Sequence, residues 1–280
     1  MRIPLEDNFS DVLSKAAHGL GVNATGLERI TGVPATRIHD VLDGEFHMST
    51  VARLAPRLNL HPGCLEELAK GAWYPDPVEL EGLAAFNTPF PVPGYQEMTV
   101  NSYLVWDPMT RKAAAFDTGA NIEAMVRTIE EKKLHLSMVC LTHAHEDHIA
   151  ALPQLLETTG HPPVWANELE PVKGAELLKA GKVFSIGYMQ VEACLTSGHS
   201  PGGTTYVISG LGIPLAIVGD ALFCCSMGGA PGHYKQALER IRREIFDLPD
   251  DTILCPGHGP MTTVLQEKLH NPFFPEFKKK

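Results

Sequence analysis

Long apolar runs, paired cysteines and an excess of positive charge are all missing from this chain of 280 residues. No apolar run approaches the roughly 20 residues that a bilayer crossing needs, which argues against a membrane protein. The opening residues, MRIPLEDNFSDV, lack the apolar core of a secretion signal, so we expect a cytoplasmic protein. The six cysteines are scattered, apart from the adjacent Cys224 and Cys225. This pattern suits a reducing compartment rather than a disulfide framework.

The net charge of the chain further limits the kinds of partner that we expect. The net charge is −10 at pH 7, which argues against general affinity for the phosphates of nucleic acids. Hydrophobic residues make up 44% of the chain and charged residues 20%, as in an ordinary globular protein. A chain of this length forms one large domain or two smaller ones, so the boundary has to come from sequence patterns.

Proline marks that boundary. Five prolines occur between residues 75 and 93, and proline both restricts φ and removes an N–H donor. We therefore interpret residues 76–93 as a Pro-rich linker between a helical domain, residues 1–75, and a second domain, residues 94–280. In the second domain short β-type runs alternate with helical patterns, which is typical of a layered α/β architecture.

The first domain contains two helical patterns that meet at the segment TGVP, residues 31–34. A glycine turn followed by proline near a helix start is typical of two helices joined at an angle. Residues 10–70 resemble the Cro/repressor type of helix-turn-helix, and the positions that pack its helices are Leu27, Gly32, Val33, Ile38 and Leu42. Residues 1–75 nevertheless carry seven Lys/Arg against nine Asp/Glu, so we expect dimerisation or coverage of a pocket, with DNA binding as the open alternative.

A cluster of ionisable residues stands out in the second domain. The stretch LTHAHEDHIA, residues 141–150, directly follows the apolar run LHLSMVCL. His143 and His145 would point to the same side of an extended chain, and Asp147 and His148 follow where a helix should begin. Taken alone, such a stretch is also compatible with a charged surface loop.

Three further candidates occur in the same context, each at the end of a short apolar strand: His199 in TSGHSPGG, Asp220 in PLAIVGD and His258 in CPGHGP. Loops at strand ends converge readily on one site. A carboxylate that ends a buried strand has to be paired or ligated. The pattern therefore predicts a metal site.

The motifs THxHxDH, GHSPG, GD and GHGP together resemble the metallo-β-lactamase superfamily over about residues 86–270. The resemblance implies its four-layer αββα sandwich, here preceded by a small all-α domain, and a site for two divalent metal ions. It assigns one metal to three histidines, which are His143, His145 and His199. It assigns the second metal to Asp147, His148 and His258, and it gives Asp220 the role of bridging the two metals. Asp117, at a turn that matches another motif of the family, would orient a metal ligand.

The chemistry implied is hydrolysis by a hydroxide held between the two metals. Asp147 would also accept the proton of the nucleophile and assist the leaving group. Zinc suits the imidazole and carboxylate ligands, with iron or manganese as alternatives. Glu146 has no role in the family, and we expect it to face solvent.

Within the superfamily, the segments NSYLV, THAHEDHIAAL, GHSPGGTTYVI and VGDALF are similar to the glyoxalase II type of thioester hydrolases. The similarity implies hydrolysis of a hydroxyacyl-glutathione such as S-D-lactoylglutathione. Two features depart from that type, because CCSMGGAPGHY lacks the family's arginine and no cationic helical extension follows NPFF. Candidate substrate contacts are His233, Tyr234 and Lys235, whose alternative role is a capped helix start with surface side chains.

Several alternatives therefore stay open. A persulfide dioxygenase, a lactonase or a phosphodiesterase would use the same fold. A DNA-binding regulator with a hydrolase-fold sensor domain would be a different class of protein. In each case we expect a small-molecule ligand, no membrane partner, and self-association, if any, through residues 1–75.

Overall fold

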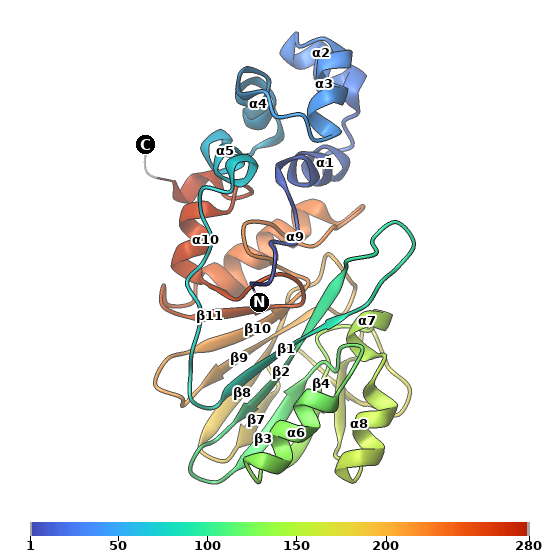
Figure 1. Cartoon of the computed structure of the whole chain (residues 1–280), viewed down its shortest axis with the longest axis vertical. Coiled ribbons are helices and arrows are strands. Elements are labelled where there is room, and N and C mark those ends of the chain that lie inside the picture. The colour runs from blue at the N-terminus through green and yellow to red at the C-terminus, as the bar shows by residue number, and fades with distance from the viewer. Residues whose placement is uncertain (1, 279–280) are drawn as a thin grey trace.

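Two six-stranded sheets form the centre of the computed structural model, which describes residues 2–278 (Figure 1). The strand order in the first sheet is β1 (Leu83–Pro89), β2 (Thr99–Trp106), β3 (Lys112–Phe116), β4 (His135–Cys140), β5 (Val164–Asn167) and β6 (Glu176–Leu178). The order in the second sheet is β12 (Thr262–Thr263), β11 (Ile253–Pro256), β10 (Leu215–Gly219), β9 (Thr204–Ser209), β8 (Met189–Leu195) and β7 (Val183–Ile186).

Apolar side chains from both sheets meet in a shared core. Strand β8 alternates, with Met189, Val191 and Ala193 buried in that core and Gln190 and Glu192 exposed. This alternation is expected where one face of a strand packs against another sheet and the other face meets water. The two-sheet α/β sandwich expected from the sequence is confirmed.

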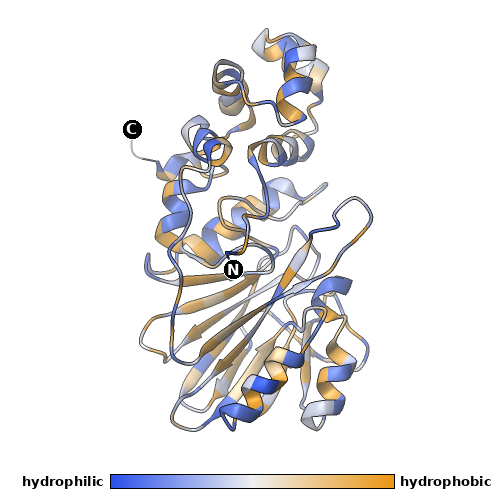
Figure 2. Ribbon diagram, viewed as in Figure 1, coloured by the Kyte–Doolittle hydropathy of each residue, from blue (hydrophilic) through white to orange (hydrophobic). Residues whose placement is uncertain are grey.

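Helices cover the outer faces of the sheets. The first sheet carries α6 (Glu123–Glu131) and α8 (Leu152–Thr159), and Figure 2 shows hydrophilic and hydrophobic residues along both helices. The second sheet carries α9 (Tyr234–Ile241), continued by a π-helical turn (Arg242–Phe246), and α10 (Val264–His270). A short helix, α7 (Glu146–Ile149), and a final 3₁₀ turn (Pro275–Phe277) complete this part. None of the helices within residues 2–278 has the length and apolar character that a bilayer crossing requires.

The N-terminal part of the structure is helical. It comprises α1 (Phe9–Gly19), α2 (Ala24–Thr31), α3 (Ala35–Leu42), α4 (Met48–Leu54), a 3₁₀ turn (Ala55–Leu58) and α5 (Pro62–Lys70). Asn8 and Asp11 form a capping box at the start of α1. Gly32 ends α2 with a φ of 66°, the left-handed conformation that glycine adopts freely. The turn between α2 and α3 therefore matches its prediction, while the helix-turn-helix identity stays a prediction.

These helices share their core with the rest of the chain. Leu13 of α1 and Leu65 of α5 belong to the same buried cluster as Leu238 of α9 and Phe273. The N-terminal helices therefore form a further layer over α9 and α10 (Figure 1).

The segment predicted as a linker contains a strand. β1 pairs with β2 along its whole length, from Leu83 opposite Val105 to Pro89 opposite Thr99. Because β1 is an edge strand, the missing N–H of Pro89 at its end costs no hydrogen bond inside the sheet. The linker prediction does not hold for residues 83–89.

Candidate metal centre

The predicted ligands lie where neighbouring strands end. β4 leads into the loop of His143 and His148, β8 into that of His199, β10 into Asp220 and β11 into His258. All seven side chains singled out from the sequence come together at this edge of the two sheets. Their role as metal ligands stays a prediction.

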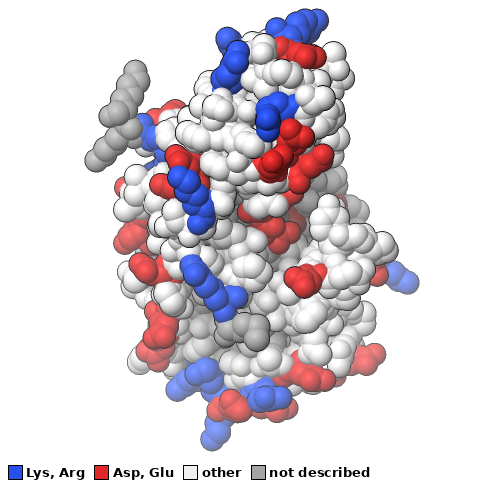
Figure 3. Space-filling view, turned by 45° about the horizontal axis from the view of Figure 1, so that its top comes forward, with Lys and Arg blue, Asp and Glu red and all other residues white. Residues whose placement is uncertain are grey.

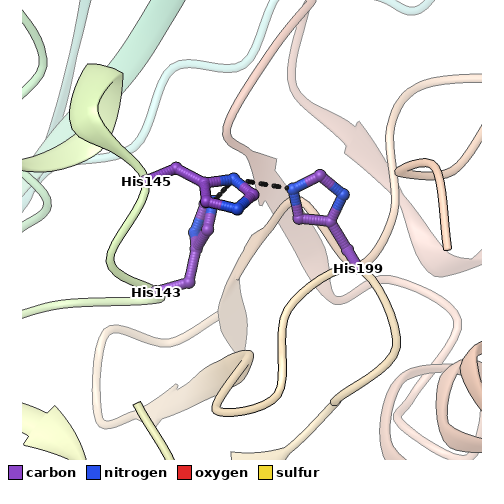
Figure 4. A group of neighbouring side chains, drawn as sticks. All are labelled: His143, His145 and His199. Carbon is purple, nitrogen blue, oxygen red and sulfur yellow. Dashed lines mark hydrogen bonds between the residues drawn. The ribbon is translucent and has the colours of Figure 1, made fainter. Parts of the chain in front are cut away.

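Three histidines form the first cluster. Nε2 of His143 and Nε2 of His199 each lie 3.0 Å from Nδ1 of His145, and Figure 4 shows the three rings converging on one point. The Nδ1 atoms of two of these rings have partners of their own. His143 Nδ1 lies 3.0 Å from the hydroxyl of Thr142, and His199 Nδ1 donates to the carbonyl of Gly229. The orientation of these two rings is thus set before any metal binds.

Asp147, His148 and His258 form the second cluster. Oδ2 of Asp147 lies 3.3 Å from Nε2 of His258 and 3.6 Å from Nε2 of His148. The opposite nitrogens are engaged, because His258 Nδ1 donates to the carbonyl of Thr99 at 2.7 Å and His148 Nδ1 donates to Asp117 at 2.8 Å. Both histidines therefore offer Nε2 toward the centre.

Asp220 stands between the two clusters. Its Oδ2 lies 3.4 Å from Nε2 of His199 and 3.4 Å from Nε2 of His258. Its Oδ1 lies 3.3 Å from Nε2 of His148. One carboxylate thus reaches ligands of both clusters, as a bridging residue must.

The charges within the site favour the binding of a metal ion. Burial alone would raise the pKa of Asp220, but His258 and His148 hold it well below its usual range. Burial lowers the pKa of His143 and of His199, which leaves neutral imidazoles. His148 differs, since Asp220 and Asp117 outweigh its burial and raise its pKa to about 10. A metal ion would displace that proton.

Two buried atoms support the fit of a metal. His148 Nε2 and Asp220 Oδ1 lie 3.3 Å apart without forming a hydrogen bond, and neither has another hydrogen-bond partner among the residues that the structure describes, although an unpaired buried polar atom is costly. Gly257 lines the same spot, where a Cβ would collide with Asp220 Oδ1 and His148 Cε1. The donors are imidazole nitrogens and carboxylate oxygens, which suit zinc, iron or manganese. The chain thus carries a candidate site for two metal ions.

Asp117 ties the two clusters together. Its Oδ1 accepts from the backbone N–H of Thr142, and its Oδ2 accepts from the Thr142 hydroxyl, both at 2.7 Å, and from His148. Thr142 in turn precedes His143. The backbone of Asp117 has a φ of 56°, a conformation that a non-glycine residue adopts only where its surroundings hold it. Through these contacts Asp117 would orient His148, and its role as an orienting carboxylate stays a prediction.

Glu170 is a supporting residue that sequence reasoning missed. Its Oε1 accepts from the N–H of Ala144, between His143 and His145, and its Oε2 accepts from the N–H of Gly202, both at 3.0 Å. One carboxylate therefore joins the two loops of the first cluster. In the sequence Glu170 stands in the polar stretch NELEP and shows nothing that separates it from Glu168.

The predicted substrate contacts separate into two groups. His233 and Lys235 are exposed, and His233 lines a pocket that also includes His199. Tyr234 is buried in the core, with its ring against Gly19 and 6.3 Å from that of Phe273. This position does not support a substrate contact for Tyr234. Glu146 is exposed, as predicted.

Comparisons with known proteins agree with this geometry. Residues 95–258 match the model of the "Metallo-beta-lactamase superfamily". The chain is 30% identical over 207 residues to "Hydroxyacylglutathione hydrolase GloC" of Haemophilus influenzae, an alignment that covers 65% of this chain and 95% of that protein. The crystal structure of the BLEG-1 B3 metallo-beta-lactamase is similar at 30% identity and a TM-score of 0.57, covering 68% of this chain and 99% of that one. The structure of ETHE1 from Myxococcus xanthus is similar at 28% identity and a TM-score of 0.56, covering 62% and 78%. With its candidate metal-ligand motifs on converging strand ends and the family model matched over more than half of its length, the chain belongs to the metallo-β-lactamase superfamily.

Proposed function

We propose that this metallo-hydrolase cleaves thioesters of the hydroxyacyl-glutathione type. The observation that carries the proposal is the pair of ligand clusters joined by Asp220, together with 30% identity to a hydroxyacylglutathione hydrolase over 95% of that protein. The reaction would add water to the thioester carbonyl, break the carbon–sulfur bond and release a hydroxy acid and a protonated thiol.

Each part of the site has a task in this proposal. His143, His145 and His199 would hold one metal ion, and Asp147, His148 and His258 the other. The bound metals would supply an activated water and polarise the carbonyl. Asp147 keeps 11% of its side chain exposed beside His258, so it can take up the proton of the attacking water and return it to the leaving sulfur.

The test is a substrate panel on purified enzyme whose metal content has been measured. We expect S-D-lactoylglutathione to be hydrolysed with a higher kcat/KM than a lactone or a phosphodiester, and we expect chelation to abolish the activity. Readdition of zinc, iron or manganese singly would identify the metal that restores it. His145→Ala should remove metal and activity, whereas Glu146→Gln, an exposed neighbour in the same loop, should retain both. Hydrolysis that survives complete metal removal would contradict the proposal.

A second candidate is a persulfide dioxygenase, which the similarity to ETHE1 from Myxococcus xanthus favours. That activity would consume oxygen in the presence of glutathione persulfide, while a thioester hydrolase consumes none. An oxygen electrode trace with the iron-loaded protein separates the two candidates directly.

For the N-terminal helices we propose a structural role rather than DNA binding. Arg37, on the helix that would enter the major groove, forms a 3.5 Å ion pair with Asp40 and lies 2.7 Å from His47. Figure 3 shows acidic and basic side chains mixed over this part of the drawn face, without a continuous basic surface. Binding to random duplex DNA that weakens steeply with salt, measured by fluorescence anisotropy, would contradict this role.

A further inference from the structure

A pocket of about 380 Å³ opens beside the first histidine cluster. The loop of His199 forms one wall and the outer face of α9 forms another, with apolar contributions from Leu169 and Leu195. Its volume falls within the range of small-molecule sites. Because His199 offers Nε2 to the metal cluster and 21% of its side chain remains exposed, a molecule in this pocket would lie next to the reacting centre.

The α9 wall has a fixed position relative to the metal site. Gln236 donates to the hydroxyl of Ser197 at 2.9 Å, and Gly198, with a φ of 148°, packs so closely on Ala237 that a Cβ would collide with it. Arg240 lies four residues beyond Gln236 on the same face of the helix. It therefore stands about 6 Å further along the helix axis from the His199 loop.

Arg240 places a permanent positive charge in this pocket. Within residues 2–278, no Asp or Glu lines the pocket. The guanidinium of Arg240 forms a 3.7 Å ion pair with Glu244, too long for a hydrogen bond, and it has no hydrogen-bond acceptor in the described part of the chain. Glu244 instead accepts from Nε of Arg243 at 2.7 Å. The N–H groups of Arg240 are thus available to a carboxylate, the group that guanidinium binds through two parallel hydrogen bonds.

We propose that this pocket holds the thiol half of the substrate and that Arg240 binds its carboxylate. The enzyme would then select thioesters of anionic, peptide-like thiols over those of neutral thiols. Leu169, Leu195 and the nearby prolines would contact the apolar part between the sulfur and the carboxylate. This inference rests on the proposed thioester hydrolysis and adds the pocket and the residue that would bind its thiol half.

The test compares Arg240→Gln with Arg243→Gln in the metal-loaded enzyme. Arg243 is the matched control, because it also contacts Glu244 but does not line the pocket. The two substrates share the acyl group: S-D-lactoylglutathione carries carboxylates on its thiol half, and S-D-lactoyl-N-acetylcysteamine carries none. We expect Arg240→Gln to raise KM for the glutathione thioester about tenfold at nearly unchanged kcat, since a partly exposed charged hydrogen bond is lost. KM for the neutral thioester should not change, and Arg243→Gln should alter neither value. Equal effects on both substrates, or no effect, would overturn the proposal.

A binding measurement separates this inference from the proposed function. S-hexylglutathione is a thioether that cannot be hydrolysed, and calorimetric titration gives its Kd whether or not the enzyme acts on thioesters. If neither thioester is cleaved, the proposed function fails, but tenfold weaker binding of S-hexylglutathione to Arg240→Gln still supports the pocket. If S-hexylglutathione does not bind the wild-type enzyme, or binds both variants equally, the pocket assignment is wrong.

Discussion

Replacing Glu170 by alanine tests how the two loops of the first histidine cluster are held together. The change removes two hydrogen bonds of 3.0 Å, from the backbone N–H groups of Ala144 and Gly202. A hydrogen bond to a charged group contributes about 1.5–3 kcal/mol, and the lower end applies because Glu170 is only half-buried. Loss of a carboxylate that orients a metal site typically reduces metal affinity about 10–100-fold. We therefore expect the affinity of the His143 cluster to fall within that range, with little change at the cluster of Asp147.

The measurement is a cobalt titration followed by visible absorption, which distinguishes strong from weak sites in the same protein. Glu168→Ala is the matched control, since Glu168 lies in the same turn, is exposed and makes only a 3.7 Å ion pair with Lys179. Wild-type affinity at both sites in Glu170→Ala would refute this reasoning. Equal losses in the two variants would also do so, because they would indicate general destabilisation of the turn.

Three further predictions follow from single contacts. Asp117→Asn replaces a carboxylate oxygen that accepts from His148 or Thr142 with an amide NH₂ group, which cannot accept a hydrogen bond. We expect at least tenfold weaker binding of the second metal, measured as metal content after dialysis. An unchanged metal content would contradict this expectation. Burial raises the pKa of Glu267 from 4.5 to about 7 against the opposing hydrogen bonds from Asn271 and Thr262. The folded state thus binds this proton more tightly than the unfolded state, so the stabilisation is complete below pH 4.5 and is lost as pH rises through 7, by about 3 kcal/mol. Glu267→Gln should flatten the fall of Tm between pH 5 and 8, and an unaltered slope would show that another group causes it. Leu13→Ala creates a cavity in the core shared by α1 and α9, so we expect a loss of about 2–5 kcal/mol in one transition for the whole chain. A separate early transition of the N-terminal helices in calorimetry would contradict that expectation.

The strand ends that carry the candidate ligands were predictable because each one combines two local signals. Asp220 follows a wholly apolar strand, and His258 follows another, so burial and a change to polar residues coincide within a few positions. Such signals depend only on neighbours in the sequence. The same reasoning failed for β1, since the prolines in and around it suggested a linker, and the pairing with β2 that makes it a strand comes from residues further along the chain.

Other features depend on contacts between distant residues. β6 has three residues and only Leu178 is buried, so its pairing with β5 has no pattern of its own. Glu170 acts through backbone N–H groups, which every residue but proline carries, and no side-chain motif reveals such a partner. Tyr234 was predicted at the site because of its neighbours in the sequence, whereas Gly19 of α1 leaves space for its ring in the core.

The N-terminal segment also reaches the candidate metal site, and this contact affects the interpretation of the N-terminal helices. Asp7 is buried and accepts hydrogen bonds from Lys15 of α1 and from Ser226, six residues after Asp220. Just before it, Oε2 of Glu6 lies 4.0 Å from Nδ1 of His258. A separable DNA-binding unit would make no such contacts with loops that carry candidate metal ligands. The segment before α1 therefore links the N-terminal helices to the candidate metal centre, although the superfamily match begins only at residue 95. Deletion of residues 1–75 would consequently disturb the loop after Asp220 as well as any self-association, so oligomeric state is better tested with surface substitutions on α2 and α3.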